Sequence, residues 1–315
     1  MKYVLGNNVV SYFVSYVLDI PIIKHKTLEI QDGNHGPDII PEKLLELTKL
    51  LFEDCTILEY ERFYSDRGKF TSKKPTNFNN IYSLYTRGKT ITENSYLNQL
   101  KKYQKYVSVS GLGPEESFNA LMLKIKENVN KNCIDKQVKE ITFDQKLRFN
   151  DSELEYNSII STINLVDLVE LQSSGKIRDS IIENYNLDGF NLPYNDKFIY
   201  TCELTSEEDK VLSGIYKQVL ATGQPYYKKT YIGDKIIYEC MRNIYDNEIE
   251  ENKILNYFET TQISDNLNLS KVSGIDLLGK FSQWTNNINL ETLYNNCLEL
   301  KEFYNSSENN HKKVL

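Results

Sequence analysis

The turn Gly6-Asn7-Asn8-Val9-Val10-Ser11 holds the residues near the amino end whose types and spacing could bind a ligand. It follows a β-rich run at 2–5 and opens an amphipathic helix over 7–18, and a second apolar run covers 20–23. A strand, a tight turn, a helix and a second strand begin the dinucleotide-binding βαβ unit, in which phosphate binds at the amino end of the helix. Residues 1–24 therefore indicate either a nucleotide site or an ordinary surface-covering βα unit.

Four residues determine how well this stretch matches the pattern G-x-G-x-x-G of dinucleotide sites. Gly6 permits the tight turn, Asn8 tolerates positive φ better than most residues, and Ser11 is small enough for the helix to pack near the strand. Lys24 stands at the end of the second apolar run, where an acidic ligand to the ribose is usual. The glycine pattern is degraded, and the predicted cofactor contacts of this stretch are Gly6, Asn8, Ser11 and Lys24.

The composition is that of a globular protein and restricts the possible partners. With 40% hydrophobic and 26% charged residues, the 315-residue chain can bury one large core or two modest ones. The net charge of −7 argues against a broad phosphate-binding surface, so direct binding of nucleic acid would need a local basic site. The 23 tyrosines and the many asparagines suggest an AT-rich coding genome, as in some firmicutes and their phages.

We expect a cytoplasmic protein that does not enter a membrane. No run approaches the ~20 apolar residues that span a bilayer, and polar residues interrupt the first apolar stretch, which argues against a signal peptide. The five cysteines are scattered and odd in number, which suggests reduced thiols. With three histidines and no paired cysteine spacing, we expect no metal site.

Hydrophobic periodicity predicts the elements along the rest of the chain. The predicted helices cover 42–52, 92–106, 115–129, 164–170 and 290–304. The predicted strands are an antiparallel meander within 138–156 and single strands at 56–58, 69–71, 158–162, 197–202, 226–231, 235–240 and 274–279. The last ten residues, 306–315, are polar and are expected to form a flexible tail.

This order of elements predicts an α/β fold with two regions. A Rossmann-like nucleotide-binding domain starts with the βαβ unit, and a carboxy-terminal strand and helix return to it. Its predicted segments are 1–55, 137–165 and 270–305. A mixed α+β substrate domain, covering 56–136 and 166–269, is inserted between them.

Three later stretches, 34–40, 156–165 and 279–284, follow the first turn in an order that resembles a known group of flavoproteins. The group contains UDP-galactopyranose mutase, protoporphyrinogen oxidase and the flavin amine oxidases. The second stretch is the most specific, because the group reads Y-D-x-x-I-S-T-I-P-L there and only Asn157 and Asn164 depart from its fixed positions. The resemblance covers nearly the whole chain, which looks short for the group, and it implies FAD as the cofactor.

The resemblance implies further contacts to the flavin. Gly36-Pro37-Asp38 looks like the mutases' G-P-H turn beside the flavin ring, with Asp38 in place of the histidine. Gly279-Lys280 looks like the carboxy-terminal G-R of the group, and the helix that starts near Asn289 would direct its amino end at the flavin. The cofactor contacts implied here are Gly36, Pro37, Thr162, Gly279, Lys280, Asn289 and Leu290.

The resemblance also implies where the substrate binds. The stretch 224–231 is similar to the strand P-(F/Y)-x-R, whose arginine faces the substrate, and Lys228 takes the arginine's place. Lysine keeps the charge and loses the bidentate fork. Asp38 and Lys228 are therefore the predicted catalytic contacts. The predicted substrate-lining residues are Tyr82, Tyr85, Tyr227 and Lys228.

We expect an FAD-dependent oxidoreductase or lyase-like enzyme that oxidises an amine C–N bond of a small or nucleotide-linked substrate. Three alternatives stay open: a sugar-nucleotide mutase of the UDP-galactopyranose mutase type, an FAD-dependent step of phage DNA base hypermodification, and a non-enzymatic protein that lost its cofactor. The changes at Asn8, Ser11 and Lys24 motivate the third. The sequence indicates neither the electron acceptor nor the oligomeric state.

Overall fold

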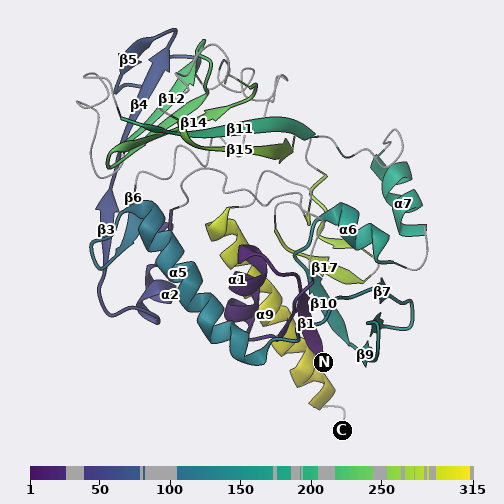
Figure 1. Ribbon diagram of the computed structural model, residues 1–315. Helices are drawn as coiled ribbons and strands as arrows, with labels where there is room; N and C mark the ends of the chain where they lie inside the picture. Colours follow the sequence, from purple (N-terminus) through teal and green to yellow (C-terminus); the bar gives the residue numbers. More distant parts are fainter. Residues whose placement is uncertain are drawn as a thin grey trace. The chain divides into compact units, whose positions relative to one another are not determined.

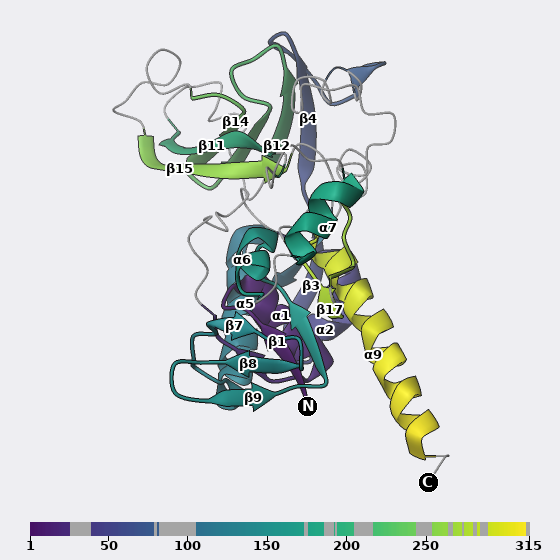
Figure 2. The same cartoon turned by 90° about the vertical axis from the view of Figure 1, so that its right-hand side faces the viewer.

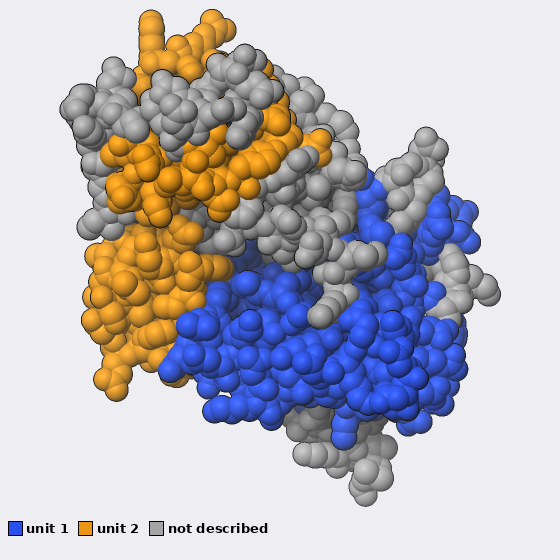
Figure 3. Space-filling view, in the orientation of Figure 1, with its two compact units in different colours: residues 1–30, 121–193, 265–315 blue, residues 31–120, 194–264 orange. Residues whose placement is uncertain are grey.

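The structure of the protein is a computed structural model. It describes residues 1–25, 39–78, 81, 105–172, 176–185, 192, 194–204, 217–243, 254–263, 267–272, 274–279, 282–283 and 289–312. The chain divides into two compact units, coloured separately in Figure 3. Unit 1 comprises 1–30, 121–193 and 265–315, and unit 2 comprises 31–120 and 194–264.

Unit 1 is built on a five-stranded sheet with the order β16-β17-β10-β1-β2, of which Figure 1 labels β17, β10 and β1. The four strands from β17 to β2 are parallel, and β16 is antiparallel to β17. The chain leaves β1 toward β2 on one side, and the later strand β10 lies on the other, so β1 and β10 flank the topological switch point. The strands are β1 (Lys2–Leu5), β2 (Ile22–Ile23), β10 (Ser158–Ser161), β16 (Lys271–Val272) and β17 (Ile275–Leu277).

Two helices of unit 1 pack against each other. Helix α1 (Val9–Leu18) is rich in β-branched residues, which favour a helix only weakly, so burial of its apolar side chains stabilises it. Helix α9 (Leu290–Lys312) places Tyr294 edge-on against Phe13, with ring centroids 6.4 Å apart. The Lys301 ammonium donates to the Val17 carbonyl at 2.9 Å, which ties α9 to the carboxyl end of α1.

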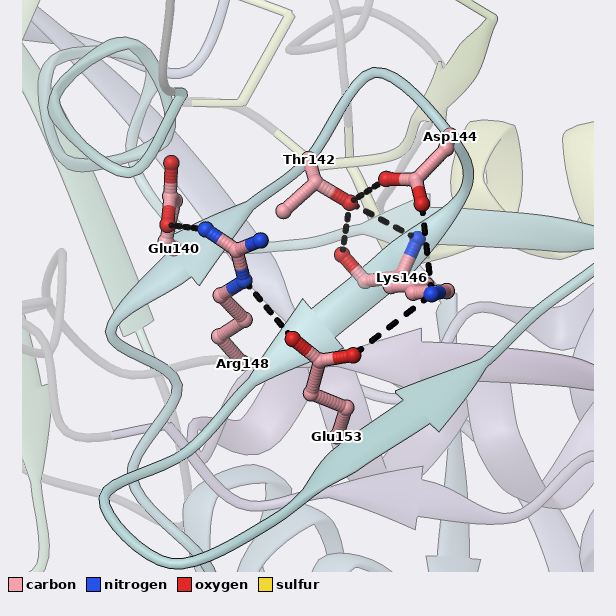
Figure 4. Close-up of polar contacts among 6 residues, drawn as sticks. All are labelled: Glu140, Thr142, Asp144, Lys146, Arg148 and Glu153. Atoms are coloured by element: carbon pink, nitrogen blue, oxygen red, sulfur yellow. Dashed lines mark hydrogen bonds and ion pairs between the residues drawn. The ribbon is translucent and has the colours of Figure 1, made fainter.

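Unit 1 also contains a three-stranded antiparallel meander, seen in Figure 2, and two shorter helices. Figure 4 shows its ion pairs: Arg148 lies 2.8 Å from Glu140 and 2.9 Å from Glu153, and Lys146 lies 3.3 Å from Asp144 and 3.6 Å from Glu153. These side chains are 30–63% exposed, so water screens the pairs. The elements are β7 (Glu140–Ile141), β8 (Lys146–Arg148), β9 (Glu153–Glu155), α6 (Leu165–Glu170) and α7 (Lys176–Tyr185).

Unit 2 is built on a seven-stranded sheet with the order β15-β11-β14-β13-β12-β4-β5 (Figure 1). All its neighbours are antiparallel except β12 and β4, which are parallel. The strands are β4 (Glu61–Asp66), β5 (Lys69–Thr71), β11 (Tyr194–Glu203), β12 (Lys217–Thr222), β13 (Lys228–Ile232), β14 (Lys235–Cys240) and β15 (Ile254–Ile263).

Smaller elements lie outside these two large sheets. Strands β3 (Cys55–Glu59) and β6 (Lys105–Val109) form an antiparallel pair. A short 3-10 turn, η1 (Glu42–Leu44), leads into α2 (Leu45–Lys49), and helix α5 (Pro114–Val129) continues into a second 3-10 turn, η2 (Asn130–Asn132).

The described residues confirm most of the predicted elements and correct two expectations. Residues 105–106, predicted as the end of a helix, belong to β6 because they pair with β3. Strands β4, β12, β15 and β16 and helix α7 were not predicted. The polar end 306–312, predicted as a flexible tail, continues helix α9, since no helix breaker follows 290.

The two units also differ from the predicted domain boundaries. Residues 31–55 group with unit 2, where the Val107 N–H donates to the Ile40 carbonyl at 2.9 Å. Residues 166–193 group with unit 1, where the Ile141 N–H donates to the carbonyl of Leu171 at 2.7 Å and so joins the end of α6 to the meander. The segments 121–136 and 265–269 group with unit 1 as well. Such contacts join segments that are distant in sequence, so local periodicity does not reveal them.

Candidate functional site

The turn after β1 lies at the switch point of the unit 1 sheet. Gly6 has φ +152°, and its N–H donates to the Ile23 carbonyl at 3.0 Å. A Cβ atom on Gly6 would lie 2.3 Å from both Ser11 Oγ and Thr162 Oγ1. No side chain fits here, because two hydroxyl groups occupy the space that it would take.

Asn8 caps helix α1 with its side chain. Its Oδ1 accepts from the Ser11 N–H at 2.8 Å, while its own N–H donates to Ser11 Oγ at 3.1 Å, which forms a reciprocal capping box. Its Nδ2 donates to the Thr162 carbonyl at 3.1 Å. The Thr162 hydroxyl donates to the Leu5 carbonyl at 2.9 Å and lies 2.7 Å from Ser11 Oγ. The predicted residues Gly6, Asn8, Ser11 and Thr162 therefore form one network, in which their polar groups bond to one another.

Lys24 and His25 follow β2 at the same edge of the sheet. The Lys24 N–H donates to the Ile134 carbonyl at 2.9 Å. His25 is buried, and its Nδ1 lies 3.1 Å from Gln137 Nε2, which donates to it. Burial, assisted by the positive charge of Lys139, lowers the His25 pKa to about 4, so this imidazole is neutral at pH 7.

The turn after β17 packs against the start of α1. Gly279 has φ +111°, and a Cβ atom there would lie 3.1 Å from Val10 Cγ1. Ser282 Oγ donates to the Ser161 carbonyl at 2.8 Å, which joins this turn to the end of β10. Ser161 Oγ and Gln283 Oε1 are buried and have no hydrogen-bond partner among the described residues. The carboxyl ends of β10 and β17 thus keep polar atoms that a ligand or water can satisfy.

The start of α9 lies where the sequence predicts it. The Asn289 side chain accepts from the Thr292 N–H at 2.8 Å, and Leu290 is the first helical residue. The remaining predicted cofactor and substrate contacts, Gly36, Pro37, Asp38, Tyr82, Tyr85 and Lys280, lie outside the described residues.

Helix α6 carries a buried carboxyl group close to the end of β10. Asn164 caps the helix by accepting from the Val166 N–H at 2.7 Å. Asp167 is 6% exposed, and its Oδ2 has no hydrogen-bond partner in the part of the chain that the structure describes. Burial, followed by the negative charge of Glu170, raises the Asp167 pKa to about 6.

In unit 2, two predicted substrate contacts belong to a buried charged cluster around Glu239. This carboxylate is 1% exposed. Lys228 Nζ lies 2.5 Å from Glu239 Oε1, Lys197 Nζ lies 2.6 Å from Oε2, and the Tyr227 hydroxyl donates to Oε2 at 3.0 Å. Burial alone would raise the Glu239 pKa, but the two ammonium groups outweigh it and hold the pKa at about 2. Glu239 is ionised at neutral pH and is a weak proton acceptor.

Strand register places this cluster on one face of the sheet together with a third buried cation, Arg62. Lys228 is paired with Glu239, and Thr230, two residues along β13, is paired with Gln218. Gln218 is paired in turn with Arg62, whose Nε donates to Gln218 Oε1 at 3.0 Å. Directly paired residues share a face of a sheet. Arg62, Lys197 and Lys228 are all less than a tenth exposed, so this polar face holds three buried cations.

Lys197, Glu239 and Arg62 were not predicted as site residues. Each lies in a strand with alternating apolar and polar residues, and no adjacent residue or motif in the sequence indicates a functional role. Only the pairing of β11, β14, β13, β12 and β4 brings them onto the polar face.

An open cavity of about 400 Å³ lies on the same face, toward the β13–β14 turn. Its walls include Thr201, Ile232 and Ile237 of the sheet, with Glu115 and Glu116 from the start of α5 opposite Lys235 and Asp234 of the turn. Burial, followed by the charge of Glu116, raises the Glu115 pKa. The described residues contain no group of three or more His, Cys, Asp and Glu side chains that could hold a metal ion, and no described helix is both long and apolar enough to cross a membrane.

Searches of protein-family models and of curated proteins found no match. Solved structures are similar in fold over nearly the whole chain. Reduced UDP-galactopyranose mutase has a TM-score of 0.65 and 10% identity, with 97% of this chain and 93% of that chain covered. An oxidoreductase from Methanosarcina mazei has a TM-score of 0.60 and 9% identity, covering 96% and 100%.

Cyclohexylamine oxidase from Brevibacterium oxydans IH-35A has a TM-score of 0.58 and 9% identity, covering 96% of this chain and 99% of that chain. At such identities the likeness is one of fold. It confirms the expected α/β architecture, in which a Rossmann-like unit built from both ends of the chain is joined to a second unit with a mixed sheet.

Proposed function

We propose that this protein is an FAD-dependent oxidoreductase that acts on an amine carrying a negatively charged group. The observation that supports it best is the likeness of fold, which spans both units and includes an oxidoreductase and an amine oxidase. The proposal assigns FAD to the carboxyl edge of the unit 1 sheet, and substrate to the polar face of the unit 2 sheet.

The residues at the carboxyl edge of unit 1 fit a dinucleotide at two places. Helix α1 begins directly at the switch point, where the first N–H groups of a helix attract phosphate. Ser161 Oγ and Gln283 Oε1, which have no hydrogen-bond partner among the described residues, would gain one from the ligand.

FAD would supply the hydride acceptor, so the chain itself needs to bind, orient and protect the substrate. Lys197 and Lys228 are the groups proposed to bind the anionic part of the substrate, and Glu239 holds both of them in place. Because the Glu239 pKa is about 2, this carboxylate is not the proton acceptor for the amine.

A sugar-nucleotide mutase is the second candidate. The likeness to reduced UDP-galactopyranose mutase and the three buried cations Arg62, Lys197 and Lys228 favour it, since a pyrophosphate-bearing substrate requires positive charge. The two candidate enzymes differ in the redox state of the flavin that binds the substrate. An amine oxidase is reduced by its substrate, whereas this mutase would bind a UDP-sugar in the reduced state without net oxidation.

The test begins with the colour of the purified protein and the release of FAD on denaturation. A folded, colourless protein that fails to take up added FAD would refute the proposed function. If FAD binds, loss of flavin absorbance on anaerobic addition of carboxylated amines supports amine oxidation. A change in reduced-flavin fluorescence on addition of UDP-sugars supports the mutase instead.

Variants of two adjacent lysines test the assigned substrate face. Lys228→Met should weaken substrate binding at least tenfold while FAD binding is kept. Lys229→Met is the matched control, because Lys229 is equally buried but points to the opposite face, 4.9 Å from the Tyr231 ring centroid. Equal losses of substrate affinity in the two variants would contradict the assignment.

A further inference from the structure

The side chain of Asn8 stands where a dinucleotide fold usually has none. In the pattern G-x-G-x-x-G the second glycine lets the pyrophosphate approach the backbone at the start of the helix. Asn8 occupies this position, with an extended backbone at φ −118° and ψ 176°. Its amide oxygen accepts the Ser11 N–H at 2.8 Å, so an oxygen of the protein itself binds an N–H group that would otherwise attract an anion.

The same side chain also bridges the switch point. Asn8 Nδ2 donates to the carbonyl of Thr162, which follows β10, while Asn8 itself follows β1. The crevice between the carboxyl ends of these two strands is where such folds bind their ligands. One amide group therefore caps the helix with its oxygen and joins the two strand ends with its nitrogen.

We propose that Asn8 is a gate on the cofactor site, and this inference rests on the proposed binding of FAD. In the free protein its side chain takes the place of the pyrophosphate on α1. FAD binds only when this side chain leaves the helix end and the Thr162 carbonyl, and the cost of breaking these bonds lowers the affinity for FAD. The free protein is folded and capped without its cofactor.

Asn8→Gly tests the gate with little risk to the fold. Glycine is nearly as good as asparagine as a helix cap, and the extended backbone of Asn8 suits it. The variant should bind FAD about tenfold more tightly than the wild type, measured by quenching of flavin fluorescence. Asn8→Asp keeps the cap but places a negative charge at the pyrophosphate, so it should weaken FAD binding at least tenfold.

Asn7→Gly is the matched control. Asn7 is the adjacent residue, and among the described residues its side chain accepts from the Tyr12 hydroxyl alone, at 2.8 Å. The dissociation constant of the Asn7→Gly variant for FAD should stay within twofold of the wild-type value. Equal affinities of the wild type and Asn8→Gly would overturn the gate and leave the proposed function standing. If no folded variant binds FAD, the proposed function and the gate both fail.

Discussion

Replacement of Glu239 by glutamine tests whether the buried cluster of unit 2 depends on this one carboxylate. The substitution keeps the volume of the side chain and removes its charge. Lys197 and Lys228 would then face each other across a neutral amide, both of them more than nine-tenths buried. Removal of one partner from a buried ion pair destabilises a protein far more than removal of one partner from an exposed pair. The reason is that the buried charge left behind has lost the opposite charge that offset its removal from water.

Two estimates give the magnitude. Loss of a partner from a buried pair costs about 3–5 kcal/mol. The Glu239 pKa of about 2, compared with 4.5 for the free side chain, corresponds to about 3 kcal/mol of stabilisation of the ionised form. For a unit of this size, about 3 kcal/mol lowers the unfolding midpoint by roughly 10 °C.

Calorimetric unfolding at pH 7 measures this difference, and Glu153→Gln is the matched control. Glu153 also pairs with two cations, Arg148 and Lys146, but lies on the exposed meander of Figure 4, so its removal should change the midpoint little. Equal, small shifts for both variants would refute the assignment of a stabilising role to the buried cluster.

The pH dependence of unfolding provides an independent check on Glu239. Its pKa is lower in the folded than in the unfolded state, so its contribution is complete above pH about 4.5 and is lost as the pH falls toward 2. In Glu239→Gln this part of the acid dependence should disappear. An unchanged acid profile in the variant would contradict the pKa that the two ammonium groups impose.

Two further predictions concern unit 1. Gly6→Ala should destabilise the protein by about 2–5 kcal/mol in urea unfolding, because its Cβ would lie 2.3 Å from Ser11 Oγ and Thr162 Oγ1 at a positive φ; a near-neutral result would contradict this packing. The Asp167 pKa is raised to about 6 in the folded state, so the contribution of this carboxyl group to stability is present below pH 3.8 and is lost as the pH rises to 6. Asp167→Asn should therefore flatten this part of the pH profile of the unfolding midpoint. A variant with an unchanged profile would count against the raised pKa.

Local patterns in the sequence were sufficient to predict much of the fold. The strand at 158–161, the strands on the two sides of Gly233 and the helix at 114–129 each have their own signals, namely an apolar run, alternation of apolar and polar residues, and a proline at a helix start. The unpredicted strands β12 and β15 depend on partners that are distant in sequence. Helix α9 continues past 304 although its last turns are polar, since absence of an apolar stripe does not end a helix.

The charged cluster shows why the site was predicted only in part. Lys228 is a predicted substrate contact because its stretch of sequence resembles a motif in which an arginine faces the substrate. Its contacts with Glu239 and Lys197 come from the pairing of three antiparallel strands, and a shift of one residue in either register would move them to the opposite face. Sequence alone identifies the residue types on each strand, but the register that brings them together is a property of the whole sheet.

The first glycine of the amino-terminal turn gives less information about ligand binding than the glycine pattern suggests. Gly6 is required by the hydroxyl groups of Ser11 and Thr162, which belong to the protein, so the fold would retain this glycine with or without a cofactor. Asn8 is different, because glycine would cap α1 nearly as well and only the asparagine side chain closes the switch point. The second position of the pattern therefore distinguishes the two cases. Tight cofactor binding favours glycine there, whereas a chain that has lost the cofactor can have asparagine.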